Sequence, residues 1–495
     1  MSDLTKVIDN LKQLLTNGDI ATVQTTLDGL DLKKIKRNQV LPLANIARRV
    51  GYTRLAVSLL NAIVRPKIFP NKSDATKDEI VEYGLCLFRL GILHEARNLL
   101  SSPIAQDSLD QKLYLAFTYF GSWDYETAQT LLESYLKSEG LSIYDRLIGK
   151  TNLAQAYYVN DSPQKAVSLL NEVIDQARSN NFKLLVGNAL QILSEAHLVL
   201  KDFDRAKDAL SKIEAEIGQF HHRYSIYIDR NFATIALYKN HDSGPLMKVR
   251  EKAKTKQLSE VCRECDLLIS CFLRDADLFR RVYYGTPHSS YRVRAKKKWG
   301  SNIELGEHYM WQIPENSKAA DIFDLENGSD QKSGASLKRG FNSHRLLQAL
   351  TSDFYKSFKS ESLFGLLYPN ECYLLETSTQ KVWDTISRTR IWLKENQIAM
   401  DIGVNFGSYN LTSETGIKIK LKLNEDQGLR DPQDSFLIDL EKKVVNKYFT
   451  SQDVASYLNF SVSSANRHLR RAFEKNLVEK IGVGRNTKYR IKKTA

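Results

Sequence analysis

The sequence predicts a mainly α-helical fold, in which an α-solenoid of helical repeats is followed by two small α+β units. From the N-terminus to about residue 280, the chain reads as successive helices, with few prolines and no sustained alternation of apolar and polar residues. A motif of small residues and leucine recurs along this region. Beyond about residue 300, short helical segments alternate with strand-like segments, which is typical of α+β units.

The recurring motif has a small residue twelve positions before an alanine and a leucine four positions after that alanine. It recurs five times, and its alanines are Ala56, Ala96, Ala128, Ala166 and Ala206. Small side chains at these positions let the two helices of a hairpin cross closely. The pattern resembles the tetratricopeptide repeat (TPR), so we expect a TPR-like domain over residues 1–284. The resemblance implies a groove that binds a protein or peptide; the alternative is a purely architectural or dimerising role.

The composition changes abruptly between Gly285 and Gly300. The segment 285–288 interrupts the helical pattern. Five basic residues then follow with no acidic residue among them: Arg292, Arg294, Lys296, Lys297 and Lys298. We therefore expect a basic linker over residues 285–301, which is either solvated or an arm that contacts phosphates.

Residues 302–423 are predicted to form the first α+β unit. Its helices are expected around Leu346, over 360–367 and over 379–394, and a β-hairpin is expected within 398–411. The motifs of this unit are Ser360-Glu361-Ser362-Leu363, Leu367-Tyr368-Pro369, Ile386-Ser387-Arg388-Thr389-Arg390 and Gly407-Ser408-Tyr409-Asn410-Leu411. They resemble the winged helix-turn-helix DNA-binding domain of OmpR/PhoB-type response regulators. The resemblance implies that outward-facing residues of the third helix contact DNA, namely Gln380, Lys381, Thr385, Arg388 and Arg390.

Residues 424–495 are predicted to form a second small unit, in which two helices are followed by a strand, a glycine-rich turn and a return strand. This pattern resembles a winged helix of the broad kind found in many bacterial repressors. Thr450 is expected to cap a helix over 451–458, and the helix over 462–475 is expected to bury Ala465, Leu469 and Phe473. Opposite that apolar side stand short hydroxyls, an amide and guanidinium groups, which suit base edges and phosphates. With the basic wing they give the candidate DNA-binding residues Ser463, Ser464, Asn466, Arg467, Arg470, Arg471, Arg485, Asn486 and Lys488.

The overall charge favours a polyanionic partner, because the net charge is +13 and the sequence pI is about 9.2. Five cysteines are too few for a disulfide framework, and neither a secretion signal nor an uncharged apolar run of membrane-spanning length appears. We therefore expect a cytoplasmic protein without a membrane partner. The pair Cys262 and Cys265 has metal-like spacing, but it lies in a helical pattern, so we expect packed core cysteines.

The sequence contains no phosphate-binding loop, zinc-protease motif or nucleophile elbow, so we expect neither an enzyme nor a cofactor or metal. Our first hypothesis is a DNA-binding transcriptional regulator. Its repeats would bind a protein or peptide, its winged helices would bind double-stranded DNA, and a homodimer is one option for its assembly. The alternative is an interaction scaffold that does not bind DNA, like PCI-type subunits, in which a winged helix follows helical repeats.

Overall fold

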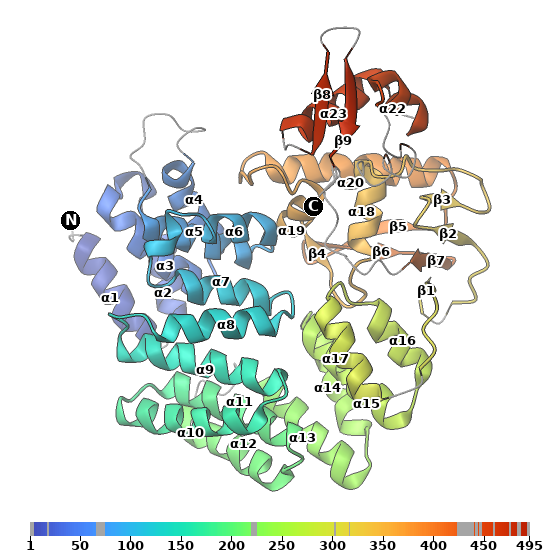
Figure 1. Ribbon diagram of the computed structural model, residues 1–495. Coiled ribbons are helices and arrows are strands. Elements are labelled where there is room, and N and C mark those ends of the chain that lie inside the picture. Colours follow the sequence, from blue (N-terminus) through green and yellow to red (C-terminus); the bar gives the residue numbers. More distant parts are fainter. Residues whose placement is uncertain are drawn as a thin grey trace.

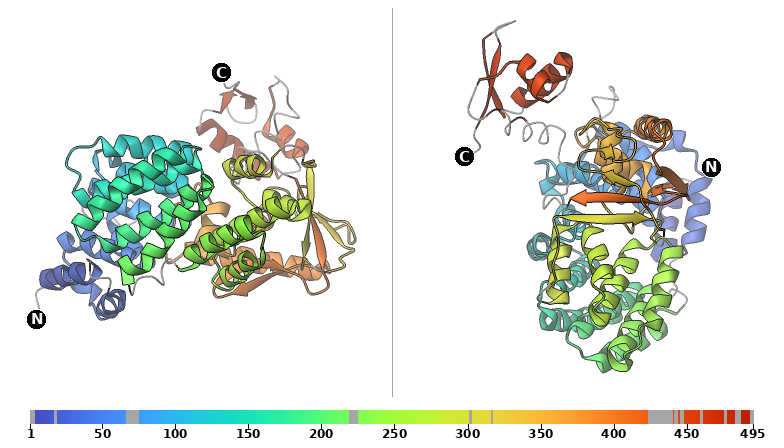
Figure 2. Two further views of the ribbon diagram at one scale, coloured as in Figure 1. Left: turned by 90° about the horizontal axis from the view of Figure 1, so that it is seen from below. Right: turned by 90° about the vertical axis from the view of Figure 1, so that its right-hand side faces the viewer.

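The structure is a computed structural model, and it describes residues 4–16, 19–65, 75–218, 225–300, 303–315, 317–422, 440, 444, 448–458, 461–474, 477–482 and 487–492. A curved array of helices occupies the N-terminal part, and small sheets with further helices follow it (Figures 1 and 2). Within the described residues, every helix is too short or too polar to cross a bilayer.

The array consists of helices that pair in sequence order. Short 3₁₀ segments at Leu32–Lys34, Arg37–Gln39 and Ala105–Asp107 interrupt it. The α-helices before the predicted linker are α1 (Leu4–Thr16), α2 (Ile20–Asp28), α3 (Val40–Arg49), α4 (Thr53–Val64), α5 (Lys77–Arg89), α6 (Leu93–Leu100), α7 (Gln111–Phe120), α8 (Tyr125–Leu136), α9 (Ile143–Val159), α10 (Pro163–Ser179), α11 (Lys183–Val199), α12 (Phe203–Ile217), α13 (Ser225–Asn240), α14 (Gly244–Thr255), α15 (Ser259–Leu273) and α16 (Ala276–Tyr284).

Side-chain caps start several of these helices. Asp124, Ser142 and Asp202 each accept a hydrogen bond from the backbone N–H three residues further along, at the first turns of α8, α9 and α12. Such caps satisfy backbone donors that have no partner inside the helix. The turns between successive helices are therefore specified locally, which favours a regular array of hairpins.

The predicted repeats coincide with the hairpins α3/α4, α5/α6, α7/α8, α9/α10 and α11/α12. All five motif alanines are fully buried. At Gly84 of α5, an added Cβ atom would lie 2.9 Å from Cγ of Leu100 on α6, so this crossing requires a residue without a side chain. The prediction that small residues mark close helix crossings is confirmed.

Residues 289–299 form helix α17 (Ser289–Trp299), so the expectation of a basic linker is wrong for this segment. Tyr291, Ala295 and Trp299 follow one another at intervals of four and bury one side of α17 against α15 and α16. Arg292 is buried as well and donates to the Thr286 carbonyl, whereas Lys296, Lys297 and Lys298 are exposed. The run of basic residues led to the prediction of a linker, whereas the segment forms an amphipathic helix that packs against the array.

The middle unit corresponds to the first predicted α+β unit and is described over residues 303–315 and 317–422. These described residues contain two small sheets and three helices. The expected helices and hairpin lie within a few residues of their predicted positions. One sheet has the order β1-β7-β2-β3, in which only the β2–β7 pair is parallel, and the other has the order β4-β6-β5. The elements are β1 (His308–Ile313), β2 (Ile322–Asp324), β3 (Ser329–Asp330), α18 (Asn342–Leu350), β4 (Phe358–Lys359), α19 (Ser360–Leu367), α20 (Ser378–Glu395), β5 (Asp401–Asn405), β6 (Ser408–Thr412) and β7 (Ile417–Lys422).

The C-terminal unit contains α22 (Ser451–Tyr457), α23 (Val462–Glu474) and the hairpin of β8 (Val478–Ile481) and β9 (Lys488–Ile491). Thr450 caps α22 as predicted, in a reciprocal capping box with Asp453. Ala465 and Leu469 are buried as predicted, but Phe473 is 48% exposed. The prediction for Phe473 was wrong, because the neighbouring Ala472 faces the core instead.

The middle unit contacts both ends of the array. At the N-terminal end, Glu361 of α19 pairs with Arg54 of α4, and the Tyr373 backbone N–H donates to Glu95 of α6 at 2.9 Å. Residues of α1–α6 and of the middle unit accordingly share one hydrophobic core. At the C-terminal end, the Tyr355 hydroxyl donates to Asp266 of α15 at 2.9 Å.

A buried ion pair completes the contact at the C-terminal end. Arg263 of α15 is fully buried and donates to Asp353 of the middle unit at 2.5 Å. Its guanidinium lies over the rings of Tyr291 and Tyr355, at 5.6 and 5.3 Å from their centroids. Burial alone would lower the pKa of Arg263, but the carboxylates of Asp353 and Glu260 raise it. The guanidinium therefore stays charged and holds the middle unit against α15.

We expect the substitution Asp353→Asn to lower the free energy of unfolding by about 3 kcal/mol, because it removes the more buried of the two carboxylates that pair with the buried Arg263. Urea unfolding of the full chain measures this loss. The control is Asp161→Asn, since the pair of Asp161 with Lys297 is exposed on both sides and contributes below about 1 kcal/mol. Equal losses in the two variants would contradict the structural role of Arg263.

Candidate functional site

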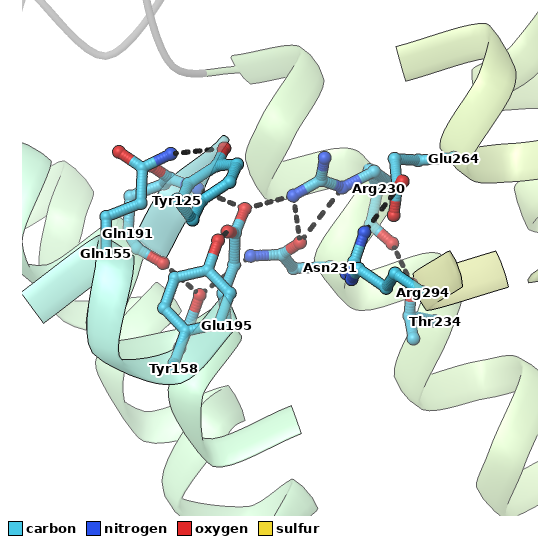
Figure 3. Close-up of polar contacts among 11 residues, drawn as sticks. Tyr125, Gln155, Tyr158, Gln191, Glu195, Arg230, Asn231, Thr234, Glu264 and Arg294 are labelled. Carbon is cyan, nitrogen blue, oxygen red and sulfur yellow. Dashed lines mark hydrogen bonds and ion pairs between the residues drawn. The ribbon is translucent and has the colours of Figure 1, made fainter. Parts of the chain in front are cut away.

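A network of polar side chains connects several helices of the array (Figure 3). Its centre is Glu195 of α11, which accepts hydrogen bonds from Arg230 of α13, from the Tyr158 hydroxyl of α9 and from the Gln191 amide at 2.6 Å. Asn231 of α13 donates to Ser194 of α11 at 2.7 Å. The network thus connects alternate helices of the array, and within it the positive charge of Arg230 lies beside the negative charge of Glu195.

The neighbouring groups in this network stabilise one another's ionisation states. Burial alone would lower the pKa of Arg230, but the carboxylates of Glu195 and Glu264 raise it. The pKa of the Tyr158 hydroxyl is raised well above its usual value, first by burial and then by Glu195, so Tyr158 remains a donor. These groups are held in fixed ionisation states, which is what a structural network requires.

Helix α17 packs against the same network. Arg294 of α17 donates to Glu264 of α15 at 3.1 Å (Figure 3), and its guanidinium lies 5.3 Å from the ring centroid of Trp123. Trp123, in the turn between α7 and α8, contacts Tyr291 edge-on at 4.5 Å and donates to Glu260 at 3.2 Å. A helix of the chain itself therefore covers part of the side of the array that carries this network.

The carboxylate of Glu264 depends on its basic neighbours. Burial alone would raise its pKa, but Arg294, Lys298 and Arg230 lower it to about 2. The charged form of Glu264 is therefore strongly favoured in the folded state. Because all three cations lie on α13 or α17, this carboxylate joins α17 to the array.

The residues predicted for DNA contact on α20 do not all face outward. Thr385 is 1% exposed; it donates to the Lys381 carbonyl and lies 2.9 Å from the Tyr368 hydroxyl, so the expectation of an outward side chain was wrong. It shares the inward side with Val382 and Thr389. Arg390 is half-buried, and its guanidinium donates to the Ile402 carbonyl of β5. Its side chain is therefore already bonded to the β5–β6 hairpin.

Three other predicted residues of α20 are exposed. Gln380 donates to Asp384 at 2.9 Å, Lys381 pairs with Glu371 at 2.5 Å, and Arg388 donates to the backbone carbonyl of Asp384 at 3.1 Å. Trp383, which the sequence analysis passed over, is 49% exposed on the same helix. The exposed side of α20 is therefore mixed in charge and partly apolar.

The predicted face of α23 is polar and basic where the structure describes it. Ser463, Asn466, Arg467 and Arg470 are exposed, opposite the buried side of the helix, and Lys488 is exposed at the start of β9. The side chains of Ser464 and Arg471 lie outside the described residues, as do Arg485 and Asn486. The described members therefore occupy one accessible side, as a groove-binding helix requires.

The sequence analysis missed a cleft between the array and the middle unit. It has a volume of about 1780 Å³ and is lined by the α5–α6 and α14–α15 turns, the start of α17, α18, residues 350–359 and the β5–β6 hairpin, and Leu458 and His468 of the C-terminal unit also reach it. Twelve Lys and Arg residues line it, against five Asp and Glu residues. These positions are far apart in the sequence, so no local motif could have revealed them.

The cysteines of the metal-like pair lie in the core. Cys262 and Cys265 are buried with the apolar side chains of α13–α15, so the prediction of packed core cysteines is confirmed. Burial raises the pKa of both thiols, that of Cys265 to about 12. Over the described parts of the chain, we find no group of three His, Cys, Asp or Glu residues placed to hold a metal ion.

Comparisons with known proteins return only solved structures, since no family model and no curated protein matches the chain. A kinesin light chain-like protein of Podosopora anserina with nearly identical TPR-like repeats is 22% identical with a TM-score of 0.29, over 38% of this chain and 96% of that chain. The apo form of RapI is 11% identical with a TM-score of 0.36, over 57% of this chain and 86% of that chain. Our description of the repeats rests on the helix pairs themselves.

We expect Glu264→Gln to lower the free energy of unfolding by about 2–3 kcal/mol at neutral pH. The pKa of Glu264 is lower in the folded state than in the unfolded state, so its contribution is present above about pH 4.5 and is lost as the pH falls toward about 2. Urea unfolding at several pH values should show the difference from the parent protein shrinking on acidification.

The matched control for this prediction is Glu216→Gln. Glu216 pairs with Arg178 on a more exposed part of the array, so its loss should cost below about 1 kcal/mol. A pH-independent difference for Glu264→Gln would contradict the ion-pair origin of its effect.

Proposed function

We propose that this protein is a DNA-binding transcriptional regulator whose helical array binds a protein or peptide. The observation that carries the proposal is the accessible face of α23, on which Asn466, Arg467 and Arg470 stand opposite a packed core. Amide and guanidinium groups at helical spacing suit base edges and phosphates in a major groove. The net charge of the chain adds a general attraction to polyanions.

The arrangement of the C-terminal unit supports a winged-helix assignment. Helix α23 packs against α22 and against the hairpin of β8 and β9, and Phe449 bridges to Tyr489 of that hairpin. In this architecture the second helix enters the major groove and the hairpin contacts the backbone beside it. Lys488 pairs with Ile481 at the end of the hairpin next to the turn, and its positive charge suits a phosphate contact.

The middle unit contributes less to the proposed DNA contact. Its hairpin has no basic residue at the tip, and Phe406 there is 86% exposed. Helix α20 offers Arg388 and Gln380 on its exposed side, together with the acidic Asp384. We therefore propose α23 as the principal DNA contact and α20 as a secondary one, within a second winged helix of the OmpR/PhoB kind.

The alternative function is an interaction scaffold of the PCI kind that does not bind DNA. The exposed Trp383 of α20 and Phe406 of the β5–β6 hairpin favour it, because aromatic side chains are enriched at protein interfaces. The two functions differ in their response to salt: binding of duplex DNA weakens steeply as salt rises, with a slope set by the number of phosphate contacts. A homodimer remains a prediction under either function.

We expect the double substitution Arg467→Ala with Arg470→Ala to weaken duplex binding by about tenfold to a hundredfold and to reduce the salt slope by about two. Thermal stability should stay nearly unchanged, since both side chains are exposed. Fluorescence anisotropy with a labelled duplex at several salt concentrations measures both quantities on the full chain.

Lys183→Ala with Lys201→Ala is the matched control, because it removes the same charge from exposed positions of the array. The control should leave affinity and slope within about twofold of the parent protein. If the α23 variant retained the parent salt slope, α23 would not be the DNA contact.

A further inference from the structure

The cleft between the array and the middle unit carries positive charge that the protein does not neutralise. Lys254 and Lys256 lie on its array side, and Lys356 and Lys359 lie on its middle-unit side; all four are exposed. Within the part of the chain that the structure describes, none of the four has a carboxylate within ion-pair distance. Their charges therefore remain available to a ligand.

Charge pairs involve residues of both signs in the cleft. Asp353 and Glu260 both pair with Arg263, and Glu315 pairs with Arg281. Glu326 lies 3.7 Å from the imidazole of His308, and Asp124 caps α8. Among the basic lining residues, Arg250 pairs with Asp266 and Lys422 pairs with Glu307. The positive potential that a ligand would meet therefore comes chiefly from the four exposed lysines.

Arg97 of α6 adds a charge that only neutral groups contact. It donates to the Thr118 carbonyl at 2.8 Å and to the Thr118 hydroxyl at 3.2 Å, and it lies 4.3 Å from the ring centroid of Tyr119. Burial lowers the pKa of Arg97, which reflects the incomplete compensation of its charge. An anion bound in the cleft would supply that compensation.

Two helices also begin at this cleft. Ser259 starts α15 and Ser289 starts α17, and the residues before them, Leu258 and His288, provide no side-chain cap. Free backbone N–H groups at a helix N-terminus carry partial positive charge and bind anions. They add to the lysines and do not define the site by themselves.

We propose that this cleft binds an acidic peptide segment of a partner protein. Apolar side chains such as Leu258, Leu325 and Leu366 also line the cleft, which suits a peptide with both acidic and apolar residues. A volume of about 1780 Å³ exceeds the roughly 300–1,000 Å³ of ordinary small-molecule pockets. The proposal identifies the partner class for the array and rests on that part of the proposed function, not on DNA binding.

Single-stranded nucleic acid fits the cleft less well. Such ligands bind through open aromatic faces on which bases stack. In the cleft, Trp311 and Phe354 stack on each other at 4.2 Å between ring centroids, and Lys338 lies over Phe341 at 4.6 Å. Because Trp311 and Phe354 cover one face of each other and Lys338 already lies over the 41% exposed Phe341, an acidic peptide is the better match.

The test is fluorescence anisotropy of the full chain with a labelled peptide of alternating glutamate and leucine. A peptide of alternating glutamine and leucine has the same apolar content without the charge and should bind at least about tenfold more weakly. Lys254→Glu with Lys256→Glu, and separately Lys356→Glu with Lys359→Glu, should each weaken binding of the acidic peptide by about tenfold or more. Lys183→Glu with Lys201→Glu makes the same change elsewhere and should have no effect.

The proposal requires both lysine pairs to matter, since they lie on the two sides of the cleft. Equal binding of the two peptides, or unchanged affinity in either folded variant, would overturn it. Tighter binding of a single-stranded oligonucleotide through the same lysines would assign the cleft to nucleic acid and would also overturn it. Arg467 and Arg470 do not line the cleft, although His468 between them does. The Arg467→Ala with Arg470→Ala variant should therefore bind the acidic peptide normally, so a failure of the DNA-binding proposal is distinguishable from a failure of this one.

Discussion

A fully buried guanidinium fixes how the parts of this protein are placed. Arg263 in the array remains charged in the interior because two carboxylates pair with it, Glu260 of its own helix and Asp353 of the middle unit, since an unpaired buried charge costs several kcal/mol. The pair of Arg54 with Glu361 holds the middle unit to the opposite end of the array. With both contacts in place, the array and the middle unit form a closed arrangement, and the cleft between them exists because of that closure.

In this closed arrangement, two regions of the molecule differ in their balance of positive and negative charge. In the polar network, Glu195, Arg230, Glu264 and Arg294 neutralise one another and hold α17 in place. In the cleft, positive charge is left over. A ligand in the cleft would contact the array and the middle unit together, so it could bias their relative placement by its differential affinity for two arrangements. Partner binding and the presentation of the C-terminal unit would then be thermodynamically linked.

The sequence predicted what depends on local pattern. The helix crossings followed from small residues at fixed spacing, and the α18–α20 helices, the hairpins and the Thr450 cap followed from periodicity and turn residues. The failures arose where distant residues decide the outcome. The charge run of α17 suggested a linker because its burial depends on Trp123 and Glu264, which lie far away in the sequence. The burial of Thr385 and the exposure of Phe473 depend on small rotations of their helices about the helix axis, which the sequence pattern does not determine. The cleft is formed by residues that are far apart in the sequence and share no motif.

Hydrogen–deuterium exchange of the full chain, with and without duplex DNA at low salt, tests the central claim most directly because it reports on every segment at once. The account predicts slower exchange in the peptides that cover residues 461–474, where Arg467 and Arg470 are exposed, and unchanged exchange in α15 and α17 at the polar network. Slower exchange confined to the array, with no change over residues 461–474, would contradict the assignment of α23 as the DNA contact.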